Sequence, residues 1–159
     1  MNCKGLGLRK SRPEGESGQS LVETAFLVPL LVLVLMGAVE FGRVAYESIE
    51  VTNAAKAAVQ YGAQNRTTAI DATGMRTAAT KDAPNVSGLT TSVSTACTCS
   101  NTQYIPTSCS DNTTCSSHGA VNEVTLTVTT SATFSPIIHC PGLPGSITLH
   151  GQAVQRVMN

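Results

Sequence analysis

The chain has 159 residues and no net charge at pH 7, with 4% aromatic residues, no Trp and only 13% charged residues. Without clustered Lys and Arg to neutralise phosphates, this composition gives no reason to expect a nucleic-acid partner. The scarcity of aromatic and charged residues, with a second half rich in Thr, Ser, Val and Gly, favours thin β-structure over a large enzyme core.

Residues 1–18 form a basic leader with no periodic pattern. The cations Lys4, Arg9, Lys10 and Arg12 all precede a long apolar run. By the positive-inside tendency, we expect the N-terminus to stay in the cytoplasm and the chain after Val39 to lie outside. Five of the six cysteines follow the apolar run, where an oxidising compartment would permit disulfides. The charge bias and the cysteine distribution therefore predict the same orientation.

An apolar run follows the leader, and residues 24–39 carry no charge. Counted from Leu21, the run has 19 positions, within the roughly 17 to 25 that span a bilayer. We therefore predict a transmembrane helix at 19–40, kinked where Pro29 removes a backbone donor.

Three other interpretations of the apolar run compete with a membrane span. A conventional signal peptidase needs small residues at the first and third positions before its cut, but Met36 or Leu35 would occupy the third. A lipoprotein signal needs a cysteine directly after the run, and the next one is Cys97. A buried helix of a soluble protein is the remaining alternative. The strongly aliphatic composition of the run and the cations that precede it make this alternative less favoured.

Helical character continues to about Gln64, outside the membrane. Two adjoining stripes of mostly small residues follow the seven-residue spacing: Val44, Val51 and Ala58, and Ser48, Ala55 and Gly62. This narrow face is expected to let the helix approach a partner closely. Surface ion pairs worth about 0.2 to 0.5 kcal/mol each are expected from the spacing of Glu40, Arg43 and Glu47. A solvated helix face explains these charges as well as a docking site does.

A second, short helix is predicted from Thr68 to Lys81, before Pro84. Three later segments alternate apolar and polar residues as strands do: Leu89–Thr95, Val124–Thr129 and Ile147–Ala153. The class is therefore α+β, with a membrane-spanning helix and a small antiparallel sheet of three or four strands. The regions run 1–18 (leader), 19–40 (span), 41–82 (extracytoplasmic helices) and 83–159 (β-rich domain).

Four cysteines, Cys97, Cys99, Cys109 and Cys115, lie in a segment (97–115) expected to be a loop between the first two strands. Disulfides would order such a polar loop by about 2 to 4 kcal/mol each. Three connectivities are open, and a hairpin-like loop favours nested pairing of Cys97 with Cys115 and Cys99 with Cys109. Zinc binding with help from His118 is the alternative, but structural zinc ligands are usually spaced by two to four residues, unlike these.

The junction between leader and apolar run, Gly18 to Glu23, looks like a prepilin peptidase site, also called a type III signal peptide. Gly18 is small enough for a protease that fits closely around the backbone. Cleavage before Gln19 would expose a new amine, and by analogy with pilins Glu23 would pair with it. A charge moved into lipid costs about 2.5 to 3.5 kcal/mol, so a functional pairing is expected. The alternative is a helix-start carboxylate favoured by the helix dipole.

Downstream elements extend this likeness: Glu40-Phe41-Gly42-Arg43, Tyr46, Asn53-Ala54-Ala55 and Tyr61-Gly62-Ala63. In this order and spacing, the segment from Gly18 to Ala63 resembles TadE-like proteins, minor pilins or pseudopilins of the tight-adherence (Flp) pilus system. The resemblance implies helix docking through Glu40, Phe41, Arg43, Tyr46 and Asn53. The chain departs from the family pattern after Asn-Ala-Ala, where Lys56 is followed by two alanines, and at Thr24, where the family more often has Phe.

The resemblance implies a non-enzymatic minor pilin or pseudopilin of a Flp/type IVb-like pilus for surface adhesion. Its partners would be a prepilin peptidase, other pilins and pseudopilins, the bacterial inner-membrane assembly platform and membrane lipid. No cofactor, metal, small-molecule substrate or nucleic acid is expected, and the histidines are dispersed (His118, His139 and His150). The alternative is an unprocessed, permanently anchored extracytoplasmic binding module.

Overall fold

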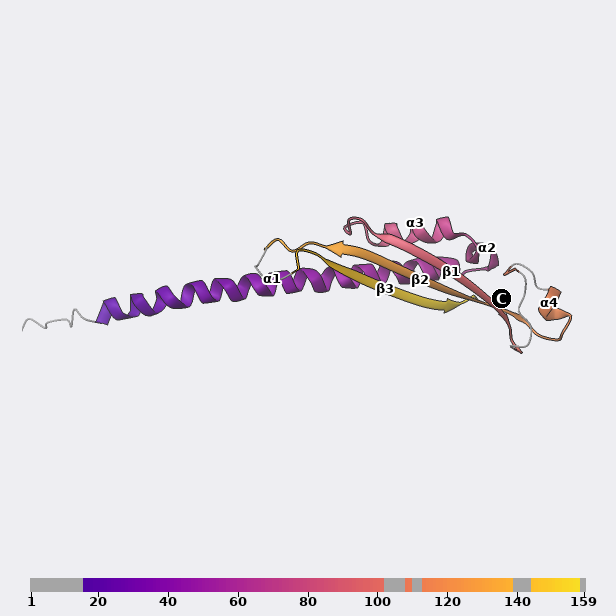
Figure 1. The fold of residues 1–159 in the computed structure, drawn as a ribbon, viewed down its shortest axis with the longest axis horizontal. Coiled ribbons are helices and arrows are strands. Elements are labelled where there is room, and N and C mark those ends of the chain that lie inside the picture. Colours follow the sequence, from indigo (N-terminus) through magenta and orange to yellow (C-terminus); the bar gives the residue numbers. More distant parts are fainter. Residues whose placement is uncertain (1–15, 102–107, 110–112, 139–143, 158–159) are drawn as a thin grey trace, which may run out of the picture. The chain divides into compact units, whose positions relative to one another are not determined.

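The computed structural model describes residues 16–101, 108–109, 113–138 and 144–157. Along the chain lie α1 (Glu16–Gly62), α2 (Arg66–Ala69), α3 (Ala72–Asp82), β1 (Thr90–Cys99), α4 (Thr113–Ser116), β2 (Asn122–Phe134) and β3 (Ile147–Arg156), shown in Figure 1. The predicted α+β class is confirmed, with its long apolar helix and small antiparallel sheet. The chain divides into two compact units, Met1–Val39 and Glu40–Asn159.

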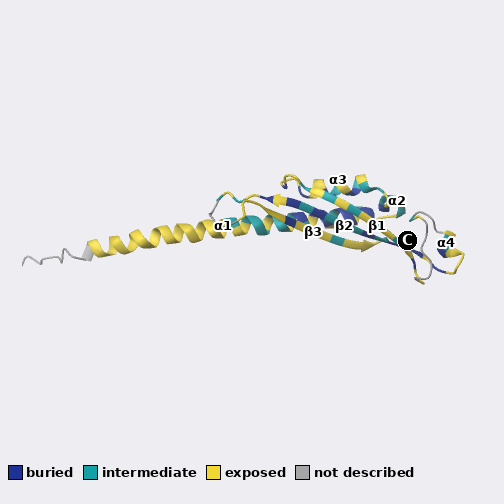
Figure 2. Cartoon of the chain, in the orientation of Figure 1, coloured by how far each residue is buried: buried dark blue, intermediate teal, exposed yellow. Residues whose placement is uncertain are grey.

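The described part of the first unit is the first half of α1, which is exposed along its whole length (Figure 2). Large apolar side chains along it are exposed, for example Phe26 at 79%. Pro29 lies inside the helix, and the Thr24 hydroxyl donates to the Ser20 carbonyl at 2.8 Å. Among the described residues, α1 alone is long and apolar enough to cross a membrane. Such a surface is expected to lie out of water.

In the second unit, the rest of α1 packs on the sheet of the same chain. Its buried residues are small or β-branched: Val51, Ala54, Ala55, Ala58, Val59 and Gly62. The prediction that the small-residue stripes face a partner is therefore wrong for Val51, Ala55, Ala58 and Gly62. These residues belong to the chain's own core, where Val51, Ala55 and Ala58 lie in one cluster with inward residues of β2.

A single close contact shows how near α1 comes to the sheet. A Cβ added to Gly151 on β3 would lie 2.7 Å from the Val51 carbonyl oxygen and 2.8 Å from Thr52 Cα. Beside it on β2, the fully buried Thr130 hydroxyl donates to the same Val51 carbonyl at 2.6 Å. The glycine thus allows backbone-to-backbone approach, and the hydrogen bond to Val51 satisfies the buried Thr130 hydroxyl.

The sheet has the order β1-β2-β3, with both pairs antiparallel. The inward residues of the central strand alternate along β2: Val124, Leu126, Val128, Thr130, Ala132 and Phe134. The three predicted strands are present, but β1 extends to Cys99. Cys97 and Cys99 are therefore strand residues, which corrects the expectation that they begin a loop.

The helix predicted from Thr68 to Lys81 is two helices, because Asp71 starts a new one. Its carboxylate accepts from the Gly74 N–H at 2.8 Å, capping α3, and from the Tyr61 hydroxyl at 3.0 Å. The Gly74 hydrogen bond, followed by the Tyr61 hydroxyl, lowers the pKa of Asp71, and the same contact raises the pKa of Tyr61. A side chain at Gly74 would collide with both Asp71 and Tyr61, so this glycine has a packing role.

The contact at Gly151 predicts a stability change. Gly151→Ala should lower the free energy of unfolding by about 1 to 3 kcal/mol, because the added methyl must push α1 from the sheet. The midpoint of urea unfolding of the full chain in detergent measures this. Gly145→Ala is the matched control, since a Cβ there meets nothing within 4 Å. Equal midpoints for the two variants would contradict the close contact.

The Asp71 cap predicts a pH dependence. Because the folded state lowers the pKa of this carboxyl, its contribution to stability is present above the unfolded-state pKa of about 3.9 and is lost as pH falls through the folded-state value. Asp71→Asn keeps an acceptor for Gly74 but cannot ionise, so its urea midpoint should fall less than the wild-type midpoint on acidification. Asp82→Asn, at the exposed end of α3, should follow the wild type.

Candidate functional site

The predicted processing junction lies in the first turns of α1. Gly18, Gln19 and Glu23 are all exposed, and a Cβ at Gly18 would meet nothing within 4 Å. Among the described residues, no hydrogen bond or ion pair reaches the Glu23 carboxylate. The junction is thus open to an enzyme, and the carboxylate is open to a partner on another chain.

Glu40 and Arg43 have intramolecular partners. Glu40 Oε2 pairs with Arg43 Nη1 at 3.1 Å, while Glu40 Oε1 accepts from the Ile137 backbone N–H at 2.9 Å. The Arg43 guanidinium lies over the Phe134 ring, 5.2 Å from its centroid, as a cation–π contact. These two side chains tie α1 to the segment after β2, a role that the sequence reasoning missed. The predicted pair between Arg43 and Glu47 does not form within the described residues.

The other predicted docking residues face outward. Phe41 and Tyr46 are 76% and 58% exposed, and Asn53 is also exposed. Tyr46 begins what we call the outer stripe of α1, in which exposed residues recur every three or four positions: Tyr46, Ile49, Asn53, Lys56 and Gln60. Ile49, 59% exposed, was missed, although its spacing from Tyr46 and Asn53 could have indicated it. The Tyr46 hydroxyl donates to Glu50, which raises the tyrosine pKa.

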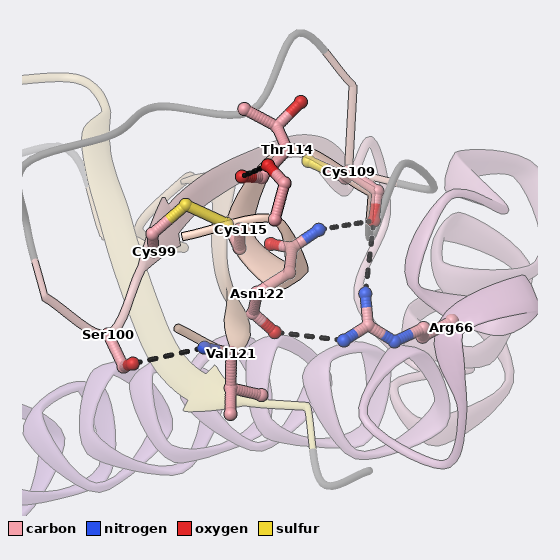
Figure 3. The surroundings of a disulfide bond; sticks show 9 residues. Arg66, Cys99, Ser100, Cys109, Thr114, Cys115, Val121 and Asn122 are labelled. Atoms are coloured by element: carbon pink, nitrogen blue, oxygen red, sulfur yellow. Dashed lines mark hydrogen bonds between the residues drawn. A yellow bond between two sulfur atoms is a disulfide. The ribbon is translucent and has the colours of Figure 1, made fainter. Parts of the chain in front are cut away.

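Two disulfides close the end of the sheet far from Phe134. Cys97 is bonded to Cys109 and Cys99 to Cys115, with Cα–Cα distances of 5.3 and 5.4 Å (Figure 3 shows the second). The predicted nested pairing is therefore wrong. The helix α4 brings Cys115 back beside the start of β2, and the register places Asn122 of β2 opposite Cys99.

Hydrogen bonds link this disulfide end to α2. Arg66 donates to the Asn122 carbonyl at 2.8 Å and to the Cys109 carbonyl at 3.4 Å, as Figure 3 shows. The Asn122 side-chain amide also donates to Cys109 O at 3.4 Å. The four sulfurs are bonded in two pairs, so they offer no thiolates to a metal ion. The structure therefore does not support the zinc alternative. Cys140 and His139 lie outside the described residues.

Together these parts define a class: a protein with one candidate membrane-spanning helix that continues into a small, disulfide-linked α+β domain. A family profile described as "TadE-like protein" matches residues 18–60, starting at the predicted junction and including Glu40, Arg43 and Asn53. The resemblance noted in the sequence is thereby confirmed, and it indicates a protein associated with the Tad pilus. Comparisons with curated proteins and with solved structures found no significant match.

The disulfide connectivity predicts a thiol count. Replacing a bonded pair, as in Cys97→Ser with Cys109→Ser, should release no thiol, because Cys99 and Cys115 stay joined. Replacing Cys97 and Cys115 together should leave two orphaned partners and add two titratable thiols to the denatured, unreduced protein. Cys3 and Cys140 contribute equally to both variants. The reverse pattern would support the nested pairing.

Proposed function

We propose that this protein is a minor pilin or pseudopilin that acts in assembly of a tight-adherence, Flp-type pilus used for surface adhesion. The observation that carries the proposal is the family match over residues 18–60, which falls on the junction and on the helix after it. The exposed apolar half of α1 supports it, since a helix with no cover of its own suits membrane storage followed by packing among other subunits.

Maturation would occur at the junction. A prepilin peptidase cuts between Gly18 and Gln19 on the cytoplasmic side and removes the basic leader. The new amine at Gln19 then lies one helical turn from Glu23 of the same chain. It can pair with that carboxylate or with Glu23 of a neighbouring chain. Their pairing lowers the penalty for placing the Glu23 carboxylate next to lipid. The exposure of all three residues is what such a reaction requires.

Docking would use the outer stripe of α1, defined above. Its exposed members offer an apolar contact at Ile49 and hydrogen-bonding groups at Asn53 and Gln60, on a face that the chain's own sheet leaves open. The partners proposed for it are other pilins and pseudopilins and the inner-membrane assembly platform. The disulfide-closed domain lies on the extracytoplasmic side in this arrangement, where disulfides persist.

N-terminal sequencing of the membrane-purified protein tests the proposal. In cells with a prepilin peptidase, the mature chain should start at Gln19, and Gly18→Ala should keep the leader, because the enlarged residue obstructs the peptidase. Gly37→Ala is a matched control in the same helix, where a Cβ also meets nothing within 4 Å. It should be processed normally.

An intact leader on the wild-type chain would contradict this function and favour the permanently anchored binding module. A Gly18→Ala chain that is still cut before Gln19 would contradict the assignment of Gly18 as the residue that the peptidase requires. Loss of pili without loss of processing is expected for Glu23→Gln, since its defect arises only after the cut.

A further inference from the structure

Three exposed apolar side chains lie at the end of the second unit where Glu40 contacts the segment after β2. Phe41 of α1 is 76% exposed, Ile137 after β2 is 69% exposed and Ile147 at the start of β3 is 40% exposed. Ile147 is the register partner of Phe134, so it lies at the same end of the sheet as Ile137. The hydrogen bond from the Ile137 N–H to Glu40 holds this end against α1. We call Phe41, Ile137 and Ile147 the collar.

The collar carries little formal charge. The sequence has no Asp, Glu, Lys or Arg from residue 124 to residue 155, a range that includes β2 from Val124 onward and the whole β2–β3 connection. Both oxygens of the neighbouring Glu40 are engaged, one by Arg43 and one by the Ile137 N–H, and its side chain is only 18% exposed. A carboxylate neutralised and covered in this way tolerates a less polar medium than water.

The position of Phe41 in the sequence indicates that the medium around the collar is the membrane interface. Phe41 follows Val39 by two residues, so it lies within about 7 Å of the end of the apolar run. As a helix, the 19 positions from Leu21 to Val39 span about 28 Å, close to a hydrocarbon core of about 30 Å. An apolar surface directly beyond the run would therefore lie at the membrane interface.

We propose that the collar is a lipid-contacting surface that seats the β2–β3 end of the domain in the extracytoplasmic interface of the membrane. Glu40 is its positioning residue, because it fixes the connection beside α1. The inference rests on the membrane anchorage contained in the proposed function, but it is independent of processing at Gly18. A second copy of the chain is the competing occupant, and the measurement below separates it from lipid.

The absence of Trp from the chain makes a single-tryptophan reporter possible. The full chain with Ile137→Trp is reconstituted in phosphatidylcholine vesicles, with and without brominated phosphatidylcholine. Two references accompany it: Phe26→Trp in the apolar run and Val121→Trp, which is 51% exposed at the other end of the 13-residue strand β2, about 40 Å away. All three sites are exposed, so the substitutions leave the core intact.

Brominated lipid should quench Phe26→Trp and Ile137→Trp, with blue-shifted emission for both, and should leave Val121→Trp unchanged. Adding Glu40→Ala to the Ile137→Trp chain should reduce the quenching, because the hydrogen bond that holds the connection is lost. Adding Glu47→Ala, a carboxylate on the same helix, should not. If Glu40→Ala also has no effect, the positioning role of Glu40 is overturned.

Quenching of Phe26→Trp alone would overturn the collar while leaving membrane anchorage intact. A blue shift of Ile137→Trp without quenching by brominated lipid would also overturn it, and would assign the surface to a second copy. If Phe26→Trp is not quenched either, the anchorage premise fails together with the collar. N-terminal sequencing of the same samples reports separately on processing.

Discussion

The close approach of α1 to the sheet at Val51 is the contact on which the second unit depends. A helix backbone lies this near a strand only where a side chain is missing, and Gly151 supplies that gap. The buried Thr130 hydroxyl is satisfied because it donates a hydrogen bond to the Val51 carbonyl. Alanines of α1 line the rest of the interface, and the same core also includes Ala69 of α2 and Met75 and Ala79 of α3.

The same helix must satisfy two surroundings along its length. From Ala25 to Val39 its side chains are apolar and exposed, whereas after Glu40 one face is buried by the chain's own sheet. Glu40 and Arg43 lie where the surroundings of the helix change. Glu40 accepts a hydrogen bond from the Ile137 N–H, and Arg43 lies over the Phe134 ring at the end of β2. Within the matched segment, these charged residues therefore have a clear intramolecular role, while Phe41 beside them stays exposed.

The far end of the sheet is held by covalent bonds and by one arginine. Among the described residues there, the buried cluster is small (Cys99, Cys115 and Ala120), and the two disulfides and the Arg66 hydrogen bonds add to it. The sequence favoured disulfides over zinc for these cysteines, because their spacing is unusual for zinc ligands. Their pairing was not identifiable from the sequence, because it depends on where α4 returns the chain relative to the strand register.

By itself, the sequence determined the apolar helix, the three alternating strands and the matched segment from Gly18, because each rests on a local period or spacing. Periodicity says which residues share a face, but not what that face meets. Only the tertiary structure decided that Ala55 and Ala58 face the sheet, that Asp71 divides a helix, that Cys99 bonds Cys115, and that Ile137 lies beside Glu40. Each of these depends on contacts or geometry that a linear pattern does not contain.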